Sequence, residues 1–153
     1  MPITANTLDR KIVQMQKVII KAPTNDFSGY ATVARNLVLE LYKLGQFDLY
    51  LDDIVWINSG NLELAAEDQR ILDSLKAKQY SGNPEDDILI HFSIATEFFG
   101  EKSPFKKTIG FTMLETDQTT QYWAQKCNGM DAIIVPSMFC MSAFMQSNII
   151  KPI

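Results

Sequence analysis

Residues 107–153 read KTIGFTMLETDQTTQYWAQKCNGMDAIIVPSMFCMSAFMQSNIIKPI, and this stretch indicates the fold class. A short apolar run is followed by a polar loop, a helical segment, a second apolar run, Pro136-Ser137 and another helical segment. Strands that alternate with helices are typical of an α/β protein with a parallel sheet. The last residues have the character of a further strand that has just begun. We therefore expect the protein to continue beyond Ile153, with this sequence as its front part.

The rest of the sequence extends the same alternation. Periodicity and turn residues predict strands at 17–22, 48–57 (one strand or two short ones), 87–92, 108–113 and 132–135, and helices at 30–44, 62–78, 119–128 and 137–147. The first helix carries an apolar stripe of Val33, Leu37, Leu41 and Leu44. Residues 1–16 are polar and irregular and are expected to form an N-terminal arm. We predict an α/β sandwich with a mainly parallel sheet over 17–153.

Composition excludes several classes of protein. The hydrophobic fraction of 46% and the charged fraction of 21% are ordinary for a soluble globular chain. A net charge of -4 offers no broad basic field for nucleic acid or anionic lipid. No apolar stretch approaches the ~20 residues of a transmembrane segment, and the N-terminus lacks the apolar core of a signal peptide. We expect a cytoplasmic protein.

Cysteine and histidine are scarce. Cys127 and Cys140 are too few for a disulfide framework and have apolar surroundings, so we expect both to fill core space. With His91 as the single histidine, the sequence gives no reason to expect a metal site. We expect no cofactor.

Candidate functional positions follow from the predicted strands. In open parallel sheets, ligands bind beyond the carboxyl ends of the strands. The residues at or just after those ends are Ser28, Gly29, Tyr30, His91, Glu115, Thr116, Pro136 and Ser137.

Each position also has a purely structural interpretation. Ser28 can cap a helix, although the glycine beside it would permit a phosphate or a sugar hydroxyl to come close. His91 can donate to a substrate or be satisfied by neighbouring backbone. Glu115 can position hydroxyls or transfer protons, or can face a helix dipole while Asp117 or Thr119 caps the helix.

For the last pair, Pro136 and Ser137, the structural interpretation is helix initiation. Neither the GxGxxG spacing of dinucleotide-binding proteins nor a Walker A loop is present.

Several motifs, in order, resemble one family. GFTMLETD at 110–117 is followed by Trp123, by CNGMD at 127–131 and by VPSMF at 135–139, and SGY at 28–30 precedes them. Together they resemble the signature of one branch of family 4 of the GT-B-fold glycosyltransferases, the glycosyltransferase group 1 type. The resemblance covers about residues 17–153. It implies the Rossmann-like N-terminal domain of such an enzyme, incomplete at its C-terminus.

The same resemblance implies a reaction and roles for the candidate residues. A second domain with an E-x7-E motif would bind a nucleotide-sugar, and the sugar would pass to a glycan or lipid-linked acceptor with retention and without a metal. Ser28, Gly29 and Tyr30 would line the cleft, His91 would touch the reacting sugar, and Glu115 and Thr116 would contact acceptor hydroxyls. Pro136 and Ser137 would shape the cleft. The resemblance gives no catalytic nucleophile.

The sequence also departs from the family pattern. It contains no E-x7-E motif, and Ala31 stands where relatives often have a second glycine. We therefore expect little activity from this chain alone, and self-association through an exposed sheet edge. The alternative is a non-catalytic glycan- or nucleotide-binding module or subunit. A nicotinamide-dependent oxidoreductase is disfavoured by the missing fingerprint.

Overall fold

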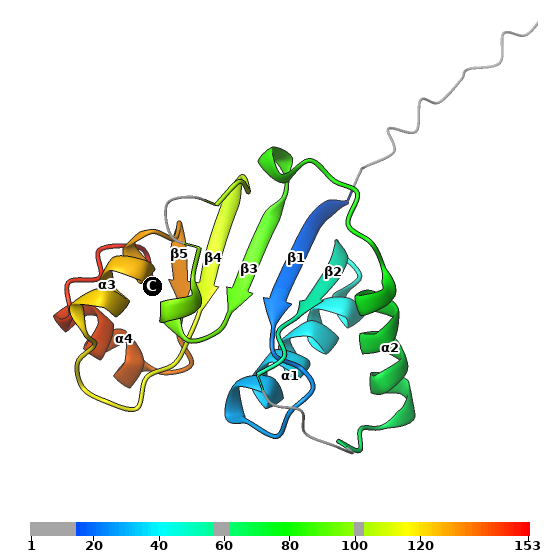
Figure 1. Ribbon diagram of the computed structural model, residues 1–153, viewed down its shortest axis with the longest axis horizontal. Helices are drawn as coiled ribbons and strands as arrows, with labels where there is room; N and C mark the ends of the chain where they lie inside the picture. Colours follow the sequence, from blue (N-terminus) through cyan, green and yellow to red (C-terminus); the bar gives the residue numbers. More distant parts are fainter. Residues whose placement is uncertain (1–14, 57–61, 100–102) are drawn as a thin grey trace, which may run out of the picture.

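The computed structural model describes residues 15–56, 62–99 and 103–153 (Figure 1). The predicted N-terminal arm lies almost wholly outside the described residues. Its last residue, Gln16, already belongs to the first strand.

A single five-stranded parallel sheet forms the centre of the protein (Figure 1). Its strands are β1 (Gln16–Ala22), β2 (Phe47–Asp53), β3 (Ile88–Phe92), β4 (Lys107–Phe111) and β5 (Ala132–Ile134). They lie in the order β2-β1-β3-β4-β5, and each neighbouring pair is parallel. The prediction of a mainly parallel sheet is confirmed, and all carboxyl ends meet at one edge.

Helices lie on both sides of this sheet. They are α1 (Gly29–Leu44), α2 (Ala66–Ala77), α3 (Gln121–Asn128) and α4 (Met138–Gln146), with short 3-10 helices η1 (Pro84–Asp86) and η2 (Ala95–Glu97). Figure 1 shows α1 and α2 beside β1 and β2, and α3 and α4 beside β5. The arrangement is a Rossmann-like three-layer α/β fold.

The larger core lies between the sheet and the first two helices. Ile20 of β1 and Phe92 of β3 are fully buried there against α1 and α2. On α1 the fully buried positions are centred on Ala34 and Val38, whereas the predicted stripe lies at the flank and its last member, Leu44, is 58% exposed. Small side chains let the helix approach the strands closely, so the inner face is rotated from the one predicted.

The opposite face of β1 and β2 combines a small apolar cluster, in which Ile19 and Tyr50 pack with Leu89, with charged side chains. Alternation along the strands brings Lys21 to face Asp52, and the Lys21 ammonium lies 2.9 Å from that carboxylate. Lys78 lies over the Tyr50 ring and donates to the backbone oxygen of Leu49 at 3.2 Å. Charged side chains that pair across strands remain compatible with water, so this face needs no apolar cover beyond that small cluster.

Strand ends differ from the prediction where a side chain engages the backbone. β4 stops at Phe111 because the Tyr30 hydroxyl donates to the Met113 oxygen (2.9 Å) and accepts from the Met113 N–H (3.1 Å). β2 stops at Asp53, whose carboxylate accepts from the Thr24 N–H at 2.9 Å. The end of the predicted second strand, Ile57, lies outside the described residues.

Two other boundaries were also wrong. α2 begins at Ala66 rather than 62, with Glu67 and Asp68 in the first turn, where the helix dipole favours negative charge. The expected strand start after 147 does not form within the described residues. Instead, the Ile133 N–H donates to the Pro152 oxygen at 2.8 Å, and proline has no N–H with which to continue a ladder.

Gly110 of β4 is a position where we expect a small substitution to destabilise the fold. A Cβ there would lie 2.6 Å from the Phe98 ring and 2.9 Å from Ile133, so Gly110→Ala should lower the free energy of unfolding by about 1–3 kcal/mol in urea titrations. Gly29→Ala is the matched control. No atom lies within 4 Å of its added Cβ, and the change should stay within about 0.5 kcal/mol. Equal stability of the two variants would contradict this packing.

Candidate functional site

The loops that follow the strands form one edge, which we call the carboxyl-end rim (residues 23–28, 54–56, 93–94, 112–120 and 135–137). Parallel pairing brings these loops to the same side of the sheet. Six predicted site residues lie on the rim or at the helix start beside it: Ser28, Gly29, Glu115, Thr116, Pro136 and Ser137. Tyr30 and His91 point into the protein instead.

A buried network fixes the loop after β1. The Arg35 guanidinium donates to the Thr24 oxygen (3.0 Å) and the Asp26 oxygen (2.7 Å). Burial lowers the pKa of Arg35, and the charge of Asp26 opposes that shift. The Asp26 carboxylate accepts from the Ser28 N–H at 2.7 Å. The only buried arginine of the described residues therefore holds the loop in place.

Ser28 and Gly29 begin α1. The Ser28 hydroxyl accepts from the Ala31 N–H at 3.1 Å, so the capping interpretation is confirmed. The space beside Gly29 is open, and Phe27, two residues earlier, is 66% exposed. The helix start is thus ordered and accessible.

Tyr30 joins two rim loops. Its ring lies 5.3 Å from Trp56 and 5.6 Å from Phe92, and its hydroxyl lies 3.1 Å from that of Thr112. With the two bonds to Met113, the hydroxyl has a full set of partners. Burial raises the pKa of Tyr30. Tyr30 therefore holds the two rim loops in place, and its hydroxyl has no hydrogen-bonding site left for a ligand.

The loop after β4 leaves its acidic residues exposed. Glu115 and Thr116 are on the surface, and the Thr116 hydroxyl donates to the Gln118 oxygen at 2.8 Å. The helix that follows is capped by Thr120, whose hydroxyl accepts from the Trp123 N–H at 3.3 Å. Capping by Asp117 or Thr119 was therefore wrong, and Glu115 remains accessible at the rim.

Pro136 and Ser137 begin the last helix. The Ser137 hydroxyl accepts from the Cys140 N–H at 3.2 Å, so helix initiation is confirmed here as well. A mostly apolar hollow of about 480 Å³ lies beside them and includes Ile134 and Met138. The two residues shape the surface at this end of the rim.

His91 occupies an unusual position. It lies on β3 between Lys21 of β1 and Gly110 of β4, and it is 1% exposed. The rings of Phe98 and Phe99 lie 5.3 and 5.2 Å from the imidazole. Neither ring nitrogen has a hydrogen-bond partner among the described residues, so satisfaction by neighbouring backbone was wrong. Burial, with the nearby Lys21 charge, lowers the pKa of His91 to about 4.

One rim cluster escaped sequence analysis. The Trp56 indole donates to the Glu97 carboxylate at 3.1 Å, and the hydroxyl of fully buried Ser93 donates to the same carboxylate. Glu97 sits in a 3-10 helix of three residues, which has too little periodicity to be recognised. The one sequence feature that could have indicated this cluster is the position of Ser93, directly after the end of β3.

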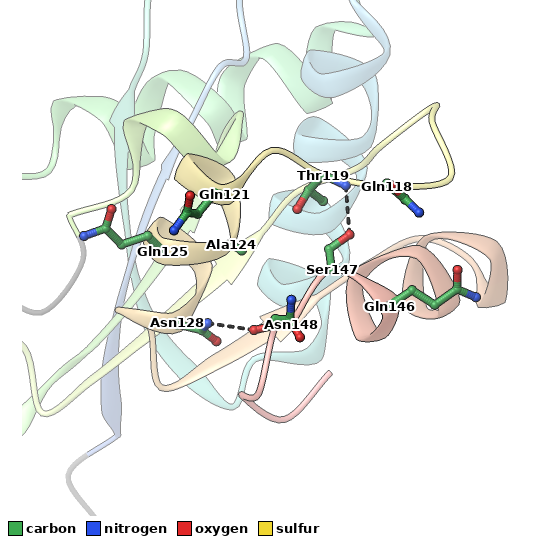
Figure 2. A pocket seen from close by; sticks show the side chains of 9 residues that line it. All are labelled: Gln118, Thr119, Gln121, Ala124, Gln125, Asn128, Gln146, Ser147 and Asn148. Carbon is green, nitrogen blue, oxygen red and sulfur yellow. Dashed lines mark hydrogen bonds between the residues drawn. The ribbon is translucent and has the colours of Figure 1, made fainter.

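A polar pocket between α3 and the end of α4 was also missed. It has a volume of about 540 Å³ and is lined by side chains that carry no charge (Figure 2). The Asn128 carboxamide donates to the Asn148 oxygen (3.0 Å) and accepts from the Ile150 N–H (2.9 Å), which fixes one wall. Gln121 and Gln125 of α3 also line the pocket (Figure 2). The predicted burial of Cys127 and Cys140 is confirmed nearby.

Two other searches concern metals and membranes. Across 15–56, 62–99 and 103–153, no three His, Cys, Asp or Glu side chains come together as metal ligands. Within these same ranges, no helix combines the length and apolarity that crossing a bilayer requires.

Removing one oxygen should test the Tyr30 connection. In Tyr30→Phe the buried Thr112 hydroxyl and the Met113 backbone lose their partner, so the free energy of unfolding should fall by about 1–3 kcal/mol. Tyr122→Phe removes a hydroxyl from a ring that is 53% exposed and should change stability by less than about 0.5 kcal/mol. Urea unfolding measures both, and a neutral Tyr30→Phe would rule out the role given to this hydroxyl.

His91 should make stability depend on pH. Its pKa falls from 6.5 when unfolded to about 4 when folded, so the unfolded chain binds the proton more readily between these values. Stability should be complete above pH 6.5 and should decline by about 3 kcal/mol as the pH falls to 4. His91→Leu lacks this titration but keeps all carboxylates. Unfolding curves of the two proteins should therefore diverge below pH 6.5, and parallel curves would contradict the burial of a neutral imidazole.

Comparison with known proteins assigns no family to this chain. It matches none of the family models, curated proteins or solved structures with which it was compared. The fold and the rim described above are therefore the basis on which a function has to be inferred.

Proposed function

We propose that this chain is the acceptor-side half of a retaining GT-B glycosyltransferase, which transfers a sugar from a nucleotide-sugar donor. The observation that supports the proposal most is the connection at Tyr30. Three hydrogen bonds, in which its hydroxyl both donates and accepts, join the Ser28-Gly29-Tyr30 segment to the segment that begins with Thr112. These are two of the segments in which the sequence resembles the family, and they are more than 80 residues apart.

The start of α1 suits the phosphate side of the donor. An α-helix leaves its first N–H groups without intrahelical partners, and Gly29 and Tyr30 contribute two of them here. The missing side chain at Gly29 leaves room for a phosphate or sugar to approach. Most of the donor would be held by the second domain that the resemblance implies.

Glu115 and Thr116 suit the acceptor. A carboxylate accepts hydrogen bonds from sugar hydroxyls, and Glu115 is exposed and takes no part in capping α3. A front-face retaining transfer depends chiefly on holding donor and acceptor in place and on stabilising the leaving phosphate. We therefore assign Glu115 to acceptor positioning and assign no nucleophile.

A non-catalytic glycan-binding module is the second candidate. The observation that favours it is the pocket between α3 and α4, whose lining is polar but uncharged. Carboxamides carry both donors and acceptors, as do sugar hydroxyls. In a module, Gln121→Ala should weaken glycan binding by the isolated chain, and no nucleotide-sugar should be consumed under any condition.

Substitution of Glu115 tests the enzyme proposal. In the protein that includes the donor-binding domain, Glu115→Ala should lower the sugar-transfer rate at least about tenfold while circular dichroism stays unchanged, because acceptor positioning is lost. Asp117→Ala, which removes a nearby exposed carboxylate, should change the rate less than about threefold.

Two results would count against the proposal. Near wild-type transfer by Glu115→Ala would remove that residue from the site. Robust turnover by the 153-residue chain alone would show that no second domain is needed.

A further inference from the structure

The imidazole of His91 is buried, and neither of its ring nitrogens forms a hydrogen bond within the described residues. A neutral imidazole has one hydrogen-bond donor and one acceptor, and neither is engaged within the described residues. Buried polar groups are normally paired, so two unpaired nitrogens on one side chain need a physical explanation. A second state in which the ring reaches water or a ligand would supply the missing partners.

The two rings that cover His91 differ in how firmly they are held. Phe98 is 1% exposed, lies against Gly110 and has its carbonyl oxygen bonded to the Lys126 ammonium at 3.1 Å. Phe99 is 45% exposed, and its ring lies 5.2 Å from the imidazole and 5.7 Å from the Lys21 ammonium. Rotation of Phe99 would therefore expose less apolar surface than movement of Phe98, which belongs to a buried core cluster.

The charges around His91 balance in number, because Lys21 and Lys126 stand against Asp52 and Glu97. Lys21 of β1 forms an ion pair with Asp52 of β2, and the Glu97 carboxylate accepts from the Trp56 and Ser93 side chains. Lys126 of α3 is bonded to the Phe98 oxygen. Two positive and two negative groups leave no net local charge that would favour a charged ligand. The position suits an uncharged group that both donates and accepts hydrogen bonds.

We propose that the Phe99 ring is a gate over a binding position whose floor is His91, and that the open gate admits a hydroxyl group or water. The gate rests on the proposed function, because the sugar contact that the family resemblance implies for His91 requires access to its ring. Closed, Phe99 keeps the imidazole dry and neutral; open, it exposes the ring beside Lys21. The test of the gate requires no sugar transfer.

The single histidine gives the gate a specific reporter. Diethyl pyrocarbonate acylates an accessible neutral imidazole at pH 7, releasing ethanol and carbon dioxide, and only residue 91 can yield carbethoxyhistidine in this chain. We expect slow but measurable labelling of the wild-type protein, followed by mass spectrometry of the peptide that contains His91. Phe99→Ala should accelerate labelling at least about tenfold, and Phe99→Leu should give an intermediate rate.

Controls separate gate opening from unfolding. Phe139→Ala removes a ring that is 54% exposed on α4 and should leave the labelling rate within about twofold of wild type. Low concentrations of urea should scarcely change the wild-type rate if only Phe99 moves, because little surface is exposed. Near-ultraviolet circular dichroism checks that each variant is folded. If Phe99→Ala is not folded, the labelling rate of Phe99→Leu is compared with that of the wild type instead.

Two outcomes would overturn the gate. Equal labelling rates for wild type and a folded Phe99 variant would show that this ring does not control access. A wild-type rate that rises with urea as steeply as global unfolding would show that His91 is reached only when the protein unfolds. The labelling rate of His91 does not depend on Glu115, and the transfer rate of Glu115→Ala does not report on Phe99. Either proposal can therefore fail while the other stands.

Discussion

The inner strand β1 pairs in parallel with β2 on one side and with β3 on the other, and all the strands out to β5 run in the same direction. Parallel strands need crossover connections, which place the helices outside the sheet and every outgoing loop at one edge. That constraint gathers residues from distant parts of the sequence without bringing them into contact. The Tyr30 hydroxyl then fixes two of those loops relative to each other. The candidate site depends on both the shared edge and this local connection.

Much of the fold was predictable because it follows from repeated patterns. Apolar β-branched runs such as 18–20 marked the strands, and Gly45, at φ 62°, ends α1 as expected. The strand ends were not predictable, because they depend on single side chains that arrive from elsewhere. The Tyr30 hydroxyl accepts a hydrogen bond from the Met113 N–H, and the Asp53 carboxylate accepts one from the Thr24 N–H. No local pattern contains such contacts.

The candidate site was predictable in position but only partly in detail. Ser28 and Ser137 cap helices, and this use is compatible with a place on the rim. The burial of His91 could not be foreseen, because its cover comes from Phe98 and Phe99 in a segment without regular periodicity. Gly110 contributes as well, since its lack of a side chain makes room for the Phe98 ring. Histidine at the end of a strand is thus an uncertain guide to accessibility.

The contact between Lys78 and Leu49 has a consequence for assembly. β2 is an outer strand of the sheet, and the Lys78 ammonium occupies one of its backbone acceptors. At the other border, the Ile133 N–H is occupied by the Pro152 oxygen. A second polypeptide that sought to extend the sheet would have to displace a lysine on one side or residues near Pro152 on the other. The association expected from an open border is therefore opposed at both of them, in the way that natural sheets resist aggregation.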